Sequence, residues 1–165
     1  MIQLVPISAS NAFTYKTIRL GALQDTPTAF GSTYAKESHL TDEEWIARAV
    51  KWNSGDKSAA FLAMDDDEAC GIAAGYFPDD GSGPYLVSMW VAASHRRQGV
   101  GRLLVNAIFD WARSRNARSL ILHVTTTNEP ALKFYDSLGF TRTGNVVPYP
   151  NDSALQEYEM SKVLE

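Results

Sequence analysis

Three arginines and two glycines are concentrated in one short segment, Arg96-Arg97-Gln98-Gly99-Val100-Gly101-Arg102. A strand-like apolar stretch precedes it and a helical pattern follows it. The first N–H groups of a helix have no partner inside the helix, and the helix dipole adds partial positive charge at that end. Glycine lets the main chain approach a ligand, and arginine pairs well with phosphate oxygens. The segment therefore predicts a pyrophosphate-binding turn.

Two familiar phosphate-binding patterns do not match this segment. A Walker A loop needs a Gly-Lys-Ser/Thr ending, and the dinucleotide pattern needs a third glycine and a paired acidic residue. Neither is present here. The segment alone leaves one alternative open, which is a capped surface helix that carries scattered arginines.

The elements on either side of the turn predict a strand–helix–strand unit. Residues 84–91 carry few charges, as expected of a central strand, and residues 120–124 form a second short apolar strand. The unit is about 40 residues long, which suits a right-handed parallel crossover. The helix between the strands is expected to bury one face formed by Val100, Leu103, Leu104, Ala107, Ile108 and Trp111.

The remaining segments contain no repeat, low-complexity stretch or linker, so we expect a single domain over residues 1–165. Residues 30–38 and 148–152 are expected to be loops. The predicted class is a mixed α/β (α+β) fold with a partly antiparallel sheet. Further strands are expected at 2–7, 59–64, 69–77, 140–147 and 155–163, and helices at 11–24, after the capping box at 41–44, and at 129–138.

The chain resembles the GCN5-related N-acetyltransferase (GNAT) superfamily in two motifs. Arg96-x-x-Gly99-x-Gly101 matches the Q/R-x-x-G-x-G/A signature, and residues 128–140 match N-x-x-A-x-x-x-Y-x-x-x-G-F. Met89-Trp90-Val91-Ala92-Ala93 resembles the fourth strand of that family. The resemblance implies a mostly antiparallel seven-stranded sheet that splays between strands 4 and 5 and is flanked by four helices. It also implies acetyl-CoA as co-substrate and no metal.

The resemblance further implies which residues hold coenzyme A. The pantetheine arm would lie along the main chain of residues 89–91, with Met89 and Val91 as its partners. Asn128 would bond to the same arm, although it also suits the role of helix cap. Main-chain amides of residues 98–102 are expected to matter more than any one arginine. The full set of expected cofactor contacts is Met89, Trp90, Val91, Arg96, Arg97, Gln98, Gly99, Val100, Gly101, Arg102, Asn128 and Tyr135.

Acetyl transfer to an amine requires removal of the amine proton, donors for an oxyanion and a proton for the leaving thiolate. Tyr135 matches the motif tyrosine that faces the sulfur, and a phenol stays protonated near neutral pH. Its alternative role is a buried aromatic. The N–H of Trp90 or Val91 would serve the oxyanion.

The proton acceptor is less clear from the sequence, because residues 85–91 contain no acid where many relatives carry glutamate. Other relatives, including ribosomal-protein N-terminal acetyltransferases, carry glutamate on the fifth strand, twelve residues before the motif tyrosine. His123 occupies that position here and could accept the proton, directly or through water. A packed histidine, with a water chain as the base, is the alternative.

The acceptor is expected to be the primary amine of a small molecule. A protein or peptide acceptor, at an N-terminus or a lysine, is the first alternative, and a non-catalytic acyl-CoA-binding module is an alternative of another class. The sequence cannot choose the acceptor, because variable loops build that pocket. The expected acceptor contacts are Phe30, Tyr34, Glu37, Trp45 and Tyr149.

The composition narrows the remaining possibilities. The net charge of −4 argues against a nucleic-acid partner, and no apolar run is long enough to span a membrane. Cys70 is the only cysteine, and no signal peptide is evident, so a cytoplasmic location is expected. No metal-ligand spacing is present. Dimers are common in the family, and the sequence leaves open whether this chain forms a homodimer.

Overall fold

A seven-stranded sheet in the order β1-β2-β3-β4-β5-β7-β6 forms the centre of the fold in the computed structural model, which describes residues 1–165. All neighbouring strands are antiparallel except β4 and β5, which are parallel. The predicted mixed sheet is therefore confirmed. Its strands are β1 (Ile2–Pro6), β2 (Ser58–Asp65), β3 (Glu68–Tyr76), β4 (Tyr85–Val91), β5 (Ser119–Thr125), β6 (Thr141–Tyr149) and β7 (Asp152–Val163).

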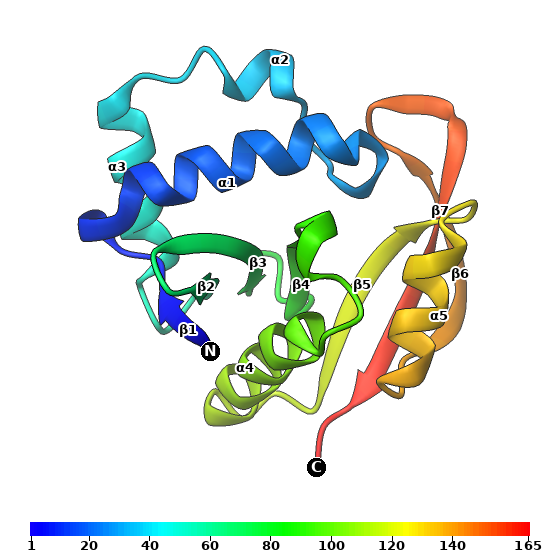
Figure 1. Ribbon diagram of the computed structural model, residues 1–165. Coiled ribbons are helices and arrows are strands. Elements are labelled where there is room, and N and C mark those ends of the chain that lie inside the picture. The colour runs from blue at the N-terminus through cyan, green and yellow to red at the C-terminus, as the bar shows by residue number, and fades with distance from the viewer.

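Helices cover both faces of this sheet (Figure 1). On one face, α1 (Ala12–Asp25) and α3 (Asp42–Trp52) enclose a core with β2 and β3. On the other, α4 (Val100–Ser114) and α5 (Glu129–Ser137) enclose a larger core. One further helix, the single turn α2 (Tyr34–Glu37), lies in a segment predicted to be a loop, because the Thr33 side chain caps its first turn. None of these helices has the length and apolar character needed to cross a membrane.

The buried face of α4 is broader than the sequence pattern predicted. Val100, Leu104 and Ile108 are fully buried as expected, but Leu103 is 45% exposed. A second row of residues is buried instead, because α4 also packs toward the end of α5. Phe109 in that row stacks on Phe140 with ring centroids 5.7 Å apart. A helix that contacts two elements buries two adjacent rows, and the single predicted stripe was wrong at Leu103.

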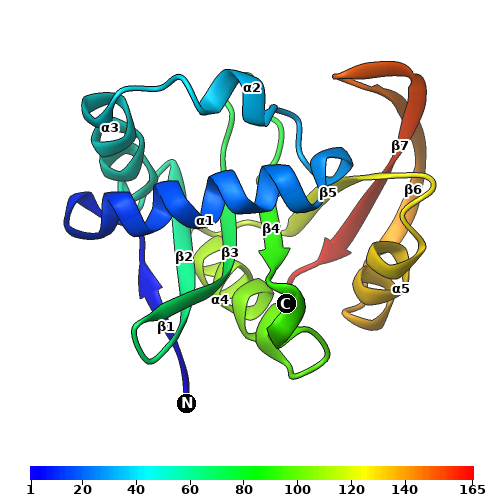
Figure 2. The same cartoon turned by 45° about the horizontal axis from the view of Figure 1, so that its top comes forward.

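Strands β4 and β5 diverge soon after their first residue pair, as the resemblance to the GNAT superfamily implied (Figure 2). Tyr85 and Ile121 form their only register pair. Beyond it, β4 contains a bulge: its pairing with β3 shifts register, and Ser88 has a φ of 57°. A bulge bends its strand and increases the local twist. The bend turns β4 away from β5 and opens the sheet at its centre.

Candidate active site

A cavity of about 770 Å³ occupies the opening between β4 and β5. Residues 95–97, 99, 101 and 102 form one end of it, whereas the expected cofactor contacts Gln98 and Val100 do not line it; β5 and the first turns of α5 form another wall. The segment after α1 closes a third side through Thr26, Thr28 and Ala29. Three elements that are distant in the sequence therefore meet around one space, at the place where the central strands separate.

The turn that joins β4 to α4 presents a row of unpaired main-chain donors. None of the amides of residues 97–102 donates a hydrogen bond to the protein, and the first helical bond runs from the Leu103 amide to the Gly99 carbonyl at 3.1 Å. Gly99 precedes the helix with a φ of 85°, a conformation that strongly favours glycine. Free amides at the positive end of a fifteen-residue helix form a site suited to an anion.

A side chain at Gly101 would crowd this turn. A Cβ atom built there would lie 3.0 Å from the Phe134 ring and 3.2 Å from the Met89 methyl group. By contrast, a Cβ at Gly99 would meet nothing within 4 Å, so only the backbone angle selects glycine there. The two glycines of the motif therefore serve different purposes.

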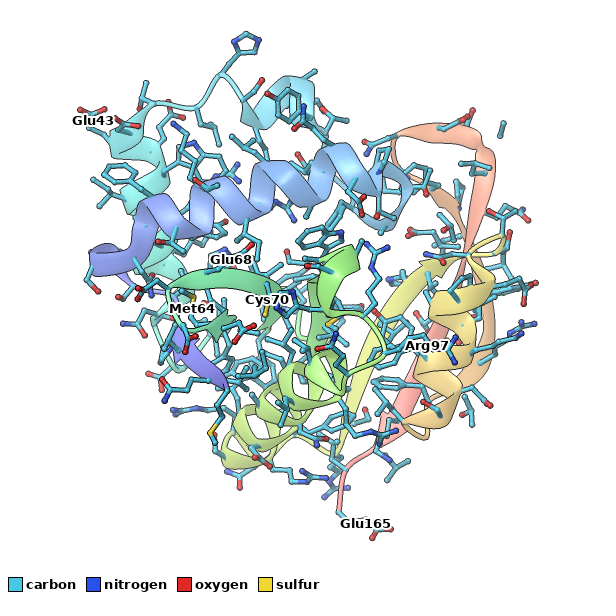
Figure 3. The ribbon with its side chains drawn as sticks, viewed as in Figure 1. Glu43, Met64, Glu68, Cys70, Arg97 and Glu165 are labelled. Atoms are coloured by element: carbon cyan, nitrogen blue, oxygen red, sulfur yellow. The ribbon has the colours of Figure 1, made fainter.

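The arginines of the turn divide into two kinds. Arg96 is used by the protein itself, since it donates to the Val91 carbonyl at 2.8 Å and to the Asp25 carboxylate at 2.7 Å. Arg97 and Arg102 are exposed and form no ion pair. Figure 3 shows Arg97 on the side of the turn that faces α5. Arg97 and Arg102 are therefore the side chains available to an anion.

Asp25, the last residue of α1, fixes the end of that helix to β4 and to the turn after it. Its carboxylate accepts hydrogen bonds from Thr26 at 2.8 Å and from the Trp90 indole at 3.1 Å, in addition to Arg96. These donors, Thr26 first, lower the pKa of Asp25. A local sequence signal could not have found this role, because Trp90 and Arg96 lie 65 and 71 residues away along the chain.

Asn128 has its predicted structural role. Its side-chain oxygen accepts a hydrogen bond from the Ala131 amide at 3.3 Å, which caps α5. Asn128 also lines the cavity, so it faces the space in which we expected a cofactor contact.

Tyr135 of α5 combines a buried ring with a hydroxyl that has no partner. The ring packs against Phe134 and, edge to face, against Phe140, with centroids 5.3 and 5.7 Å away. The residue lines the cavity, and its hydroxyl forms no hydrogen bond within the protein. Burial raises the pKa of Tyr135 further above its ordinary value. The phenol therefore stays protonated and is free to donate into the cavity.

His123 lies on the predicted face of β5, opposite the buried Leu122 and Val124, and lines the same cavity. Its Nε2 is 3.4 Å from a carboxylate oxygen of Glu159 on β7. Its ring stacks on Tyr85, with centroids 5.8 Å apart. His123 is therefore held by neighbours on two strands, yet remains at the cavity wall.

Glu157 on β7 was missed by the sequence analysis and is the only carboxylate that lines the cavity. It pairs in register with Thr125 of β5 and has no ion-pair or hydrogen-bond partner for its side chain. Burial raises the pKa of Glu157, while the charge of His123 acts in the opposite direction. Alternation puts Glu157 on the same face as Glu159, but finding His123 beside them requires the β5–β7 register.

Two predicted acceptor contacts lie in the protein interior instead. Trp45 is fully buried in the core between α1 and the sheet, where it packs edge to face on Tyr15. Glu37 is 2% exposed and accepts two hydrogen bonds from Arg19, at 2.9 and 3.0 Å, and one from Arg48 at 3.2 Å. A carboxylate so satisfied is part of a buried ion-pair network, and neither residue lines the cavity.

The other three predicted acceptor contacts also lie outside the cavity wall. Tyr34 is exposed on α2, and Phe30 and Tyr149 are buried. The Tyr149 hydroxyl donates to the main-chain carbonyls of Phe30, at 2.6 Å, and Pro27, at 3.0 Å. Asn151 donates to the carbonyl of Ser32 at 3.2 Å. The tip of the β6–β7 hairpin is therefore joined to residues 27–32, and we call these bonds the hairpin contact.

Comparison with known proteins identifies the class of the chain. Residues 22–140 match the Acetyltransferase (GNAT) family, and the chain belongs to it. Aminoglycoside N(6')-acetyltransferase type 1 of Salmonella typhimurium is 30% identical over 120 residues, which cover 68% of this chain and 79% of that protein.

Two further similarities agree with this class. N-alpha-acetyltransferase 60 of Drosophila melanogaster is 40% identical over 60 residues, which cover 34% of this chain and only 22% of that protein. A GNAT-family acetyltransferase from Streptococcus pneumoniae has the same fold, with a TM-score of 0.81, 22% identity and full coverage of both chains. The chain is thus an acyltransferase of the N-acetyltransferase type, in a family that uses acetyl-CoA.

Proposed function

We propose that the chain transfers the acetyl group of acetyl-CoA to a primary amine of a small molecule. The observation that supports this most is the row of unpaired amides at residues 97–102. Four of these residues, Arg97, Gly99, Gly101 and Arg102, line the same cavity as Tyr135 and His123. The donors for a diphosphate and the groups for proton transfer thus share one space.

The residues of the turn fit coenzyme A. Unpaired amides and two free arginines suit its diphosphate, and a Cβ atom at Gly101 would crowd the Phe134 ring. The main chain of Met89 and Val91 would hold the pantetheine arm. The Val91 carbonyl already accepts from Arg96, so the Val91 N–H is the group that remains for the arm or for an oxyanion. Asn128 would contact the arm beside the cap of α5.

Acetyl-CoA would supply an acetyl group activated as a thioester. His123 would accept the proton of the attacking amine, because only a neutral amine has a free lone pair. The N–H of Trp90 or Val91 would donate to the carbonyl oxygen as negative charge develops on it. The Tyr135 hydroxyl, with its raised pKa, would donate a proton to the sulfur as the thiolate leaves.

The hairpin contact favours a small acceptor over a peptide. A peptide-binding enzyme needs an open groove across the acceptor side, but Tyr149 and Asn151 join the β6–β7 tip to residues 27–32. Members of the family with either acceptor are similar to this chain: the Salmonella relative is named for an aminoglycoside and the fly relative for an N-alpha-amine. The peptide acceptor therefore remains the second candidate.

An acceptor panel tests this proposal. The purified chain would be incubated with acetyl-CoA and matched small amines or short peptides with free N-termini, and products would be identified by mass spectrometry. We expect acetylated small amines and much slower reaction with peptides. Preferential acetylation of peptides would support the second candidate instead. Binding of acetyl-CoA without transfer to any amine or peptide would indicate a non-catalytic binding module.

A further inference from the structure

The two ends of the cavity carry opposite charge. Arg97 and Arg102 lie at the turn, whereas Glu157 stands alone beside His123 at the other end. The neighbouring carboxylate on β7 is engaged, because Glu159 accepts from Thr143 at 2.8 Å and from Asn145 at 3.0 Å. Glu157 is therefore a half-buried carboxylate without a partner, facing the space where the acceptor would bind.

A second polar group beside Glu157 also lacks a partner. Thr125, its register partner on β5, is 2% exposed and lines the cavity, and its hydroxyl oxygen forms no hydrogen bond. Buried polar groups without partners cost free energy, and the great majority in native proteins are paired. Thr125 is one such group, but its hydroxyl oxygen is shielded from the cavity, so the Glu157 carboxylate is the unpaired polar group that a ligand can reach.

The ligand group at this position differs from the nitrogen that reacts. The attacking nitrogen must be neutral, whereas a carboxylate is best matched by a group that remains positively charged throughout. Given the proposed function, we propose that the acceptor is a primary amine that carries a second cationic group, and that the Glu157 carboxylate binds that second group. Glu157 is then a specificity-determining residue, and His123 remains the residue next to the reacting amine.

The strand register gives the separation of the two groups. His123 pairs with Glu159, and Thr125 pairs with Glu157, so His123 and Glu157 are diagonal neighbours across β5 and β7. Such neighbours are about 7–8 Å apart. A short alkyl chain between the two nitrogen atoms of a diamine spans a separation of this order, which makes a linear diamine the simplest probe.

Three acceptors with four carbon atoms test the proposal: 1,4-diaminobutane, butylamine and 4-aminobutanoate, whose far ends are cationic, neutral and anionic. With the wild-type chain we expect the highest kcat/KM for the diamine and the lowest for the amino acid. Glu157→Gln should lower kcat/KM for the diamine by about 10- to 100-fold, mainly through KM, because a charged hydrogen bond is lost. The value for butylamine and the affinity for acetyl-CoA should change little.

Asp136→Asn provides a matched control, because Asp136 is an exposed carboxylate on α5 that does not line the cavity. This substitution removes the same charge and should leave kcat/KM unchanged for all three acceptors. If Glu157→Gln lowered kcat/KM equally for all three acceptors, the proposal would be overturned, and Glu157 would be a general base or a structural residue. No preference of the wild-type chain for the diamine would also overturn it.

Calorimetric measurement of diamine binding distinguishes failure of the diamine site from failure of the proposed acetyl transfer. The diamine would be titrated into the protein in the presence of coenzyme A, which allows no transfer. Binding that Glu157→Gln abolishes, together with no acetylation of any acceptor, would support the diamine site and reject the transferase proposal. Acetylation of butylamine without measurable binding or preference for the diamine would reject the diamine site alone.

Discussion

The two ends of the central cavity are built in different ways. At the turn, six consecutive main-chain amides of residues 97–102 have no hydrogen-bond partner, and they come from one short segment. At the acceptor end, the polar groups are side chains of His123, Thr125 and Glu157, which come from two strands that the sequence separates by more than 30 residues. One end is made of backbone, and the other of side chains.

This difference separates what the family shares from what belongs to this chain. A main-chain site depends on the turn and its two glycines, so many different side chains can surround it. A side-chain site changes with each substitution. The turn should therefore determine binding of acetyl-CoA, and residues at the acceptor end should determine the choice of amine.

The largest effect is expected for the substitution Tyr135→Phe, because Tyr135 lies between the two ends of the cavity. Loss of the hydroxyl removes the proton donor to the thiolate, and kcat should fall by about a thousandfold, within the range for general acid catalysis. Affinity for either substrate should be nearly unchanged in equilibrium binding measurements. An unchanged kcat would mean that the thiolate leaves without assistance.

The pH profile of the wild-type chain tests the same residue. Burial raises the pKa of Tyr135, so its hydroxyl keeps its proton above the ordinary tyrosine value of about 10. We therefore expect no decrease in kcat from tyrosine ionisation between pH 8 and about pH 10. A decrease in that range that is absent from Tyr135→Phe would contradict this assignment.

Gly101→Val should affect the cofactor end alone. The Cβ atom of the new side chain would lie only 3.0 Å from Phe134 and 3.2 Å from Met89, so the valine would displace the turn from these residues. A displacement of about 1 Å can cost about a hundredfold, and we expect such a loss in kcat/KM for acetyl-CoA. Relative preference among amines should be kept.

The matched control for that change is Gly21→Ala on α1, where an added Cβ meets nothing within 4 Å. It should leave binding of acetyl-CoA unchanged. A change in amine preference in Gly101→Val would show that the two ends are not independent.

His123→Ala should affect the acceptor end. We expect kcat/KM for the amine to fall by about a hundredfold, at the lower end of general-base effects, with unchanged affinity for acetyl-CoA. The acidic limb of the pH profile should also change, since Tyr85, Glu157 and Glu159 are the other ionisable groups around the ring. A profile that is retained in the variant would favour a water chain as the base.

A smaller effect is expected for Tyr149→Phe, which removes the hydroxyl from the hairpin contact. The loss should lower stability by about 1 kcal/mol and raise KM for small amines only slightly. Thermal unfolding would measure the loss of stability, and kinetic assays with small amines and with short peptides would measure the change in KM. Faster acetylation of peptides in the variant would sharpen the comparison, because it would show that the hairpin contact excludes larger acceptors.

Much of this arrangement could be read from the sequence. The turn, the parallel crossover, the splayed sheet and the cap at Asn128 depend on local patterns or motifs, and the structure has each of them. The acceptor side could not be predicted in the same way. Glu37 and Trp45 looked like loop or cleft residues, but the fold buries both, because Arg19 and Tyr15 reach them from α1. The position of Glu157 beside His123 follows only from the pairing of β7 with β5, which the sequence does not reveal.

The amides of residues 97–102 provide the most direct test of the account. A titration of the isotope-labelled protein with coenzyme A, followed by amide NMR, would report each of these N–H groups separately. We expect their proton signals to move downfield as the amides bind the diphosphate, and to move more than those at the acceptor end. Signals at residues 97–102 that stay in place at saturating coenzyme A would contradict the account.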